Sequence, residues 1–200
     1  MAMLLVDAFL PATLTVPPMT DEQFAEFCSE HPDLFFEMTA EGELIVTPPT
    51  FSLLGTQSGE VFAQLRNWAR QDGRGVANDA ATGFVLANGA RRSPDACWTL
   101  KSAVANLSPE SRSKFWHLCP NFVIELRSTS DRTRIVREKM REYIANGAQL
   151  GWLIDPQKRT VEIYRPNQEP ELREGIHAIA GEGPVAGFVL DLRSVWDPFA

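Results

Sequence analysis

The chain has 200 residues, of which 44% are hydrophobic, and its formal net charge is −7 at pH 7. This length is enough to bury one hydrophobic core and too short for two ordinary domains, so we expect a single domain over residues 1–200. The acidic balance excludes a protein that coats nucleic acid through its overall charge, so any phosphate-binding surface has to be local.

The first 18 residues form a mildly apolar segment without Lys or Arg, and Asp7 and Pro11 interrupt it. These features match neither a signal peptide nor a membrane span, so we expect a cytoplasmic protein without membrane contact. We expect residues 1–18 to be a loose extension and the folded core to cover about residues 20–196.

The patterns that follow predict alternating helices and strands. In the first half they predict a helix that begins at a capping box of Thr20 and Gln23, a hairpin of residues 35–38 and 44–47, a helix over 58–70, and one or two strands within 76–86. In the middle of the chain they predict a turn at Asn88-Gly89, a strand that carries Pro94-Asp95 and a helical connection at 108–117. A strand over 122–127 follows, and then a helix from a cap at Ser130 or Asp131 to Asn146-Gly147. The last predicted elements are strands over 150–154 and 161–164 and a tail at 182–199 with a short strand and a final turn.

A strand, a helix and a second buried strand in succession indicate a parallel crossover, and the strand after them indicates an antiparallel meander. We therefore expect an α/β fold in which helices flank a central mixed sheet, with an N-terminal helix and hairpin added to it.

The strand at 122–127 is apolar, and Glu125 lies in its middle. A buried unpaired charge is strongly destabilising, so this carboxylate needs a cation, a metal ion or a bound proton. Arg127 lies two residues further along the same strand face and is one candidate partner. Asp95 lies at the entrance of another predicted strand. If the two strands are neighbours, Asp95 and Glu125 form a site for Mg²⁺, which takes oxygen ligands.

The helix after this strand has an apolar stripe, formed by Val136, Met140, Tyr143 and Ile144. Lys139 lies on one edge of that stripe, with Arg132 beside it two turns earlier. A guanidinium stays charged, which excludes Arg127 as a proton-transfer group, whereas a buried lysine can change its pKa. We therefore expect Lys139 to reach the carboxylates. The alternative is a lysine stem that follows the sheet and leaves its ammonium in water.

Five segments resemble, in order and spacing, the large family of putative restriction endonucleases abundant in cyanobacteria, a branch of the PD-(D/E)XK nuclease superfamily. The segments are residues 91–95, 119–128, 138–147, 150–156 and 161–166, within a resemblance from about Thr20 to Trp196. Members of that family share three features: the acid of a Pro-Asp motif, an acid in a strand with the pattern Val-x-Glu-x-x-Ser, and a lysine on the following helix. The resemblance therefore implies catalytic roles for Asp95, Glu125 and Lys139.

The resemblance implies three further positions. Glu60 matches an acid on the preceding helix, although it lies away from the apolar face of that helix. Glu37 matches an acid of the first hairpin that would close one side of the site, and the alternative is an exposed hairpin residue. Many members carry a histidine shortly after a Pro-Pro segment. This chain has none there, so either Gln57 replaces it or the role is missing.

Together these features predict a metal-dependent endonuclease that hydrolyses phosphodiester bonds of DNA. Asp95 and Glu125 are expected to bind Mg²⁺ or Mn²⁺, and Lys139 to position or activate the attacking water. Arg127 or Arg132 is expected to contact phosphate. Cutting both strands of a duplex usually needs two active sites, so we expect a homodimer.

Two alternatives remain. The first is a catalytically inactive module of the same fold that binds nucleic acid or supports assembly, with Glu125 paired to Arg127 for structure. The second is a metal-dependent hydrolase that acts on a small phosphoester.

Overall fold

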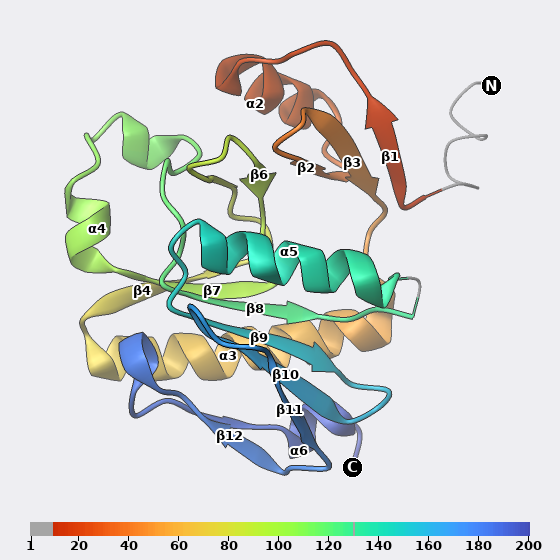
Figure 1. Cartoon of the computed structure of the whole chain (residues 1–200), viewed down its shortest axis with the longest axis vertical. Coiled ribbons are helices and arrows are strands. Elements are labelled where there is room, and N and C mark those ends of the chain that lie inside the picture. Colours follow the sequence, from red (N-terminus) through yellow and green to blue (C-terminus); the bar gives the residue numbers. More distant parts are fainter. Residues whose placement is uncertain (1–9, 130) are drawn as a thin grey trace.

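The structure is a computed structural model that describes residues 10–129 and 131–200. A central sheet runs through the molecule, and a second sheet lies beside it next to the N-terminal helix (Figure 1). In the central sheet the neighbouring strands are, in order, β11 (Glu171–Glu174), β10 (Thr160–Tyr164), β9 (Leu150–Asp155), β8 (Phe122–Leu126), β7 (Ala96–Leu100) and β4 (Gly75–Asp79).

The central sheet is mixed. Strand β8 runs parallel to β9, whereas the remaining neighbours in this sheet pair antiparallel. The connection between β8 and β9 is the helix α5 (Thr133–Ala145), and β9, β10 and β11 form a meander. The structure thus confirms both the parallel crossover and the central mixed sheet flanked by helices.

The second sheet has the order β1 (Ala12–Thr15), β3 (Glu43–Thr47), β2 (Phe35–Met38), β6 (Arg91–Arg92) and β5 (Phe84–Val85). The predicted hairpin is its centre, since β2 and β3 pair around Gly42, whose φ is +85°. The expectation of a loose N-terminal extension was wrong for β1, because that strand pairs along β3. Residues 1–9 lie outside the described part.

Helix α2 (Asp21–Glu30) begins at the predicted capping box. The Thr20 hydroxyl oxygen accepts the Gln23 N–H at 3.2 Å, and the Gln23 side-chain oxygen accepts the Thr20 N–H at 2.9 Å. Helix α3 (Ser52–Asp72) is longer than predicted and ends at Gly73, whose φ of +73° suits a residue without Cβ. A short helix α4 (Lys101–Ala105) follows β7, before the one 3₁₀ turn, Ser111–Ser113, in the described part of the 108–117 connection.

The cap predicted for α5 was wrong. Arg132 stands at the N-cap position without a side-chain hydrogen bond, and the Asp131 carboxylate instead accepts the backbone N–H of Ser128 at 2.7 Å. Ser130 lies outside the described residues. The helix ends at Asn146, followed by Gly147 with φ of +112°, as the sequence predicted.

The C-terminal part adds a small ribbon of β12 (Ala178–Ala180) and β13 (Val189–Asp191), a 3₁₀ turn at Gly183–Val185 and the helix α6 (Arg193–Trp196). In the described part of the chain, no helix has the length and apolar character that a membrane crossing requires.

Helices α5 and α3 lie on opposite faces of the central sheet (Figure 1). Successive side chains of β8 alternate between these faces. Phe122, Ile124 and Leu126 enter the core beneath α3, whereas Val123 enters the core beneath α5. The alternation directs Glu125 to the α5 face, so the buried carboxylate lies opposite the crossover helix.

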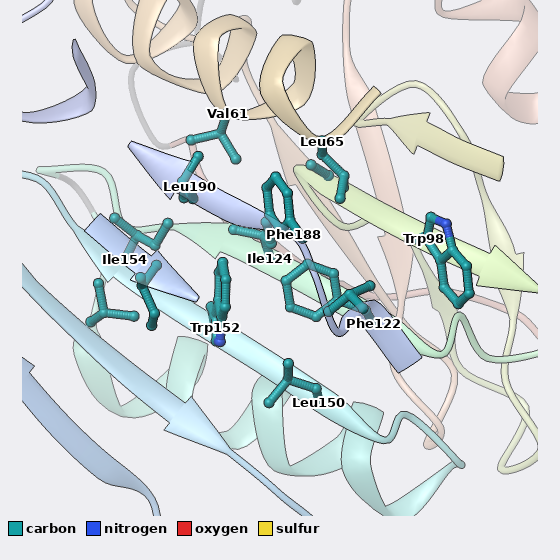
Figure 2. Close-up of a cluster of buried hydrophobic side chains, with 14 of the residues drawn as sticks. Val61, Leu65, Trp98, Phe122, Ile124, Leu150, Trp152, Ile154, Phe188 and Leu190 are labelled. Carbon is teal, nitrogen blue, oxygen red and sulfur yellow. The ribbon is translucent and has the colours of Figure 1, made fainter. Parts of the chain in front are cut away.

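The core beneath α3 is built from aromatic and branched side chains that fill the space between the helix, the sheet and the β12–β13 ribbon (Figure 2). Phe188 stacks on Trp152 with ring centroids 5.9 Å apart, and its centroid lies 5.5 Å from that of Trp68. This packing holds β8 and β9 on the α3 face of the sheet, whereas the polar cluster lies on the α5 face.

We predict that Phe188→Ala lowers the free energy of unfolding by about 3–5 kcal/mol, because it opens a cavity among these rings. The neighbouring Val189→Ala is the matched control and should change it by less than about 0.5 kcal/mol, since Phe188 is 1% exposed and Val189 58%. Urea unfolding followed by tryptophan fluorescence measures both values. Equal effects of the two variants would contradict the packing described here.

Candidate active site

Asp95 and Glu125 come together because β7 and β8 are antiparallel neighbours. Ala96 pairs with Ile124, which brings the residue before β7 beside the end of β8. The Asp95 Oδ2 atom accepts the backbone N–H of Leu126 at 2.6 Å, one residue beyond Glu125. The neighbouring strands expected from the sequence are therefore present.

Lys139 lies at the centre of the cluster. From α5 its Nζ atom approaches Glu125 Oε1 at 2.7 Å and Glu37 Oε1 at 2.9 Å. Its side chain is only 15% exposed. The prediction that Lys139 reaches the carboxylates is confirmed as geometry, and the alternative of an ammonium in water is wrong.

Glu37 joins the second sheet to this cluster. Its Oε1 atom also accepts the backbone N–H of Ser93 at 2.7 Å, and its Oε2 atom lies 3.5 Å from Nη1 of Arg92. The buried Arg92 in turn donates from Nε to Glu142 on α5 at 2.6 Å. Glu37 is therefore a partly buried, ion-paired residue, and the alternative of an exposed hairpin residue is wrong.

Tyr143 and Arg92 contribute interactions that the sequence interpretation missed. Tyr143 was assigned only to the apolar stripe of α5, but its hydroxyl donates to Glu125 Oε1 at 3.0 Å. A signal was present, because a buried tyrosine needs a partner for its hydroxyl and this one lies four residues after Lys139, on the same helix face. For Arg92, nothing in the local pattern distinguished it from Arg91.

The electrostatics of the cluster follow from its burial. Burial raises the pKa of Asp95 to about 6. Burial raises the pKa of Glu125 to about 8; Lys139 opposes this shift, and the charges of Asp95 and Glu37 add to it. The charge of Asp95 acts on Glu125 because the Asp95 carboxylate is hydrogen-bonded to the N–H of Leu126, the next residue along the strand.

Glu37 and Lys139 keep their charges, and Tyr143 stays neutral. Burial disfavours ionisation of Glu37, but Lys139 and Arg92 together with the Ser93 N–H outweigh it and lower its pKa. Burial also disfavours the charged form of Lys139, but Glu125 and Glu37 outweigh it and raise its pKa above the ordinary value. Burial, followed by the charge of Glu125, raises the pKa of Tyr143, so its hydroxyl keeps its proton at neutral pH.

The donor set fits a hard divalent cation. The carboxylates of Glu37, Asp95, Glu125 and Glu142 face the cations of Arg92 and Lys139, so the fully ionised cluster has an excess of two negative charges. Within residues 10–129 and 131–200, no hydrogen bond reaches Oδ1 of Asp95 or Oε2 of Glu125.

The same described ranges contain no group of three or more His, Cys, Asp or Glu side chains arranged as metal ligands. A pair of carboxylates nevertheless suits Mg²⁺, which usually keeps several waters and binds through one or two carboxylates.

The structure does not bring Glu60 or Gln57 to this cluster. Glu60 Oε1 accepts from Gln64 at 2.8 Å and from Ser194 at 3.2 Å, and the Gln57 amide donates to the Val195 carbonyl at 2.8 Å. Both residues lie on α3, which packs on the other face of the sheet and against α6 (Figure 1). Their hydrogen bonds hold the C-terminal helix.

Arg127 does not pair with Glu125. Its backbone N–H still donates to the Ile154 carbonyl of β9 at 2.8 Å, but its Nη1 atom lies 2.9 Å from Asp155 Oδ2, and its Nη2 atom donates to the Asp131 carbonyl at 3.3 Å. Glu125 is balanced by Lys139 instead. Arg132 is exposed at the start of α5, and it makes no side-chain hydrogen bond or ion pair within the described chain.

A mixed sheet with acids at the ends of adjacent strands and a lysine on the crossover helix is the arrangement that the family resemblance implied for this chain. The chain belongs to the Uma2 family, described as putative restriction endonuclease, whose match covers residues 21–193. The expected family and fold class are thereby confirmed.

A solved structure has the same fold. It is the crystal structure of a putative nuclease belonging to DUF820 from Anabaena variabilis ATCC 29413, with a TM-score of 0.74 and 20% sequence identity, over 90% of this chain and 98% of that chain. No curated protein matches the chain.

We predict that Lys139→Met lowers the free energy of unfolding by about 3–5 kcal/mol at neutral pH, because the ionised carboxylate of Glu37 loses a cation in a mostly buried cluster. The exposed Lys158, changed to methionine, is the control and should alter it by less than about 0.5 kcal/mol. Urea unfolding of both variants checks the difference. A Lys139→Met protein as stable as the parent would show that the carboxylates do not depend on the ammonium.

Proposed function

We propose that the chain is a metal-dependent endonuclease that hydrolyses DNA phosphodiester bonds. The observation that carries the proposal is the convergence of Asp95, Glu125 and Lys139 from β7, β8 and α5 into one cluster. Membership of the Uma2 family supports the nuclease class, and the geometry supports the assignment of these residues.

Asp95 and Glu125 are the proposed ligands of Mg²⁺ or Mn²⁺. Each carboxylate is held through one oxygen, by the Leu126 N–H or by Lys139 and Tyr143, so the other oxygen is available for a ligand. Such an ion, when bound, supplies positive charge that activates water and stabilises a phosphodiester transition state. The protein contributes a fixed pair of hard donors, since Asp95 is anchored to the backbone of the neighbouring strand.

Lys139 acts in this proposal through its charge. Glu125 and Glu37 raise its pKa, so the ammonium remains protonated at neutral pH and does not accept a proton from water. Its N–H groups can orient the attacking water and stabilise negative charge on the phosphate. Glu37 and the Ser93 N–H beyond it hold the lysine in place.

DNA contact is proposed at the exposed start of α5. Arg132 has no acidic partner within the described residues and lies on the helix that carries Lys139, so its charge is available for a phosphate. Arg127 is held by Asp155 and is a weaker candidate for that role. Cleavage of both strands of a duplex calls for two active sites, so we also propose a homodimer as the acting species.

We predict that the protein cuts plasmid DNA in the presence of Mg²⁺ or Mn²⁺ and that Asp95→Asn lowers the rate by roughly 100-fold or more. Asparagine keeps an oxygen that can accept the Leu126 N–H, so the substitution removes the charge with little change in the fold. Agarose-gel nicking assays measure the rate.

Asp197→Asn is the matched control, because the Asp197 carboxylate also accepts a backbone N–H, that of Phe199, near the end of the chain. It should cut like the parent. Parent-like cutting by Asp95→Asn, with circular dichroism showing a folded protein, would overturn the assignment of Asp95.

Metal binding should also stabilise the protein without DNA. At a free Mg²⁺ or Mn²⁺ concentration 100 times the dissociation constant, we predict a gain of about 2.7 kcal/mol in the free energy of unfolding. Thermal and urea unfolding with and without the ion measure it, and Asp95→Asn should lose most of the gain. A parent protein that gains nothing would favour a catalytically inactive nucleic-acid-binding module.

A further inference from the structure

Tyr143 is the one uncharged side chain in the described chain that donates directly to Glu125. The residue is 0% exposed and packs among the side chains of the core beneath α5, next to Met140 on the same helix. Its hydroxyl donates to Glu125 Oε1 at 3.0 Å, and the Lys139 ammonium approaches the same oxygen at 2.7 Å. Two donors of different kinds therefore converge on one carboxylate oxygen.

The χ3 torsion of a glutamate, which rotates its carboxylate, has a broad and roughly two-fold distribution. The two carboxylate oxygens therefore exchange positions readily unless a partner holds one of them. The Lys139 ammonium approaches Oε1 of Glu125 and is also shared with Glu37. The Tyr143 hydroxyl differs, since its ring is fixed by packing and places the donor at one point. The phenol thus adds a second, packed donor to the same oxygen and restricts the rotation of the Glu125 carboxylate further.

We propose that Tyr143 is a positioning residue that fixes Oε1 of Glu125 and thereby keeps Oε2 directed to a divalent cation. This inference rests on the proposed function, because it assigns to the same metal site a residue that hydrogen-bonds to one of the proposed ligands. Hydrogen-bond partners behind a ligand commonly change metal affinity by about 10–100-fold when they are removed. Tyr143 contacts neither substrate nor ion in this assignment and acts only through Glu125.

The chain supplies its own control. It contains two tyrosines, Tyr143 and Tyr164. Tyr164 is 2% exposed, belongs to the same core beneath α5, and donates its hydroxyl to Glu162 Oε2 at 2.8 Å. Glu162 pairs with Arg137 on the surface and takes no part in the cluster of Glu125. Replacing either tyrosine by phenylalanine therefore removes one hydroxyl-to-glutamate hydrogen bond, which is buried for Tyr143 and partly buried for Tyr164.

The test measures Mn²⁺ binding to the parent, Tyr143→Phe and Tyr164→Phe proteins by electron paramagnetic resonance of free Mn²⁺, without DNA. We expect Tyr143→Phe to bind Mn²⁺ about 10–100-fold more weakly and Tyr164→Phe to bind like the parent. Urea unfolding without metal, measured on the same samples, separates this effect from a loss of stability, which a merely structural hydroxyl would produce in both variants.

The outcomes separate the two proposals. If the parent binds Mn²⁺ and Tyr143→Phe binds it equally tightly, the positioning role is overturned while the metal site stands. If the parent binds no Mn²⁺, the metal site fails and the positioning role fails with it. Equal weakening in Tyr143→Phe and Tyr164→Phe would also overturn the assignment, because the effect would then follow from core packing alone.

A second measurement covers the case in which Tyr143→Phe does not fold. Parent protein labelled with 3-fluorotyrosine gives ¹⁹F signals from Tyr143 and Tyr164, which the Tyr164→Phe protein assigns. Titration with Mg²⁺ should shift the Tyr143 signal and leave the Tyr164 signal unchanged. A Tyr143 signal that does not respond to a saturating Mg²⁺ concentration would overturn the proposal.

Discussion

The central constraint on this molecule is the placement of carboxylates in a mostly buried cluster around one ammonium group. Lys139 lies between Glu125 of the central sheet and Glu37 of the second sheet, and Arg92 bridges Glu37 to Glu142 on α5. Removing charges from water is unfavourable unless each has a partner of opposite sign and good geometry. The relative placement of the two sheets and α5 is therefore tied to the pairing of these charges.

The two faces of the central sheet differ in composition, and this difference supports the cluster. The face beneath α3 is filled mainly by apolar side chains, among them the rings of Trp152 and Phe188. The face beneath α5 combines apolar packing at Met140 and Tyr143 with the charged residues at the open end of β8. A rigid apolar layer on one side thus holds the backbone of β7 and β8, to which Asp95 and Glu125 are attached.

The parts of the site that were predictable from the sequence are those that depend on local periodicity and strand order. Glu125 was recognised because a charge inside an apolar strand needs a partner, and Lys139 because the helical period places it at the edge of the apolar stripe. Both conclusions concern one element at a time, and the structure confirms that the two side chains meet. Asp95 was recognised as an acid at the entrance of a predicted strand, and the family resemblance supplied Glu37; the partners of both lie far away along the chain.

The parts that were not predictable depend on tertiary packing. No local pattern says which face of the sheet α3 covers, so Glu60 and Gln57 were assigned to the site although they hold α6. Arg127 was considered as a partner of Glu125 on the same strand, but its guanidinium pairs with Asp155, a partner that no local pattern identifies. Tyr143 was interpreted as apolar because its hydroxyl partner comes from another element.

The contact between Glu37 and Lys139 has a consequence for synthesis of the protein. The β2–β3 hairpin, β7 and β8 are synthesised before α5. A nascent chain that ends before α5 therefore contains Glu37, Asp95 and Glu125 without the ammonium of Lys139. Contacts between distant parts of a chain form slowly, because closing the intervening loop is entropically unfavourable. The cluster therefore cannot be complete before α5 has been synthesised, and shorter nascent chains lack the arrangement on which the proposed chemistry depends.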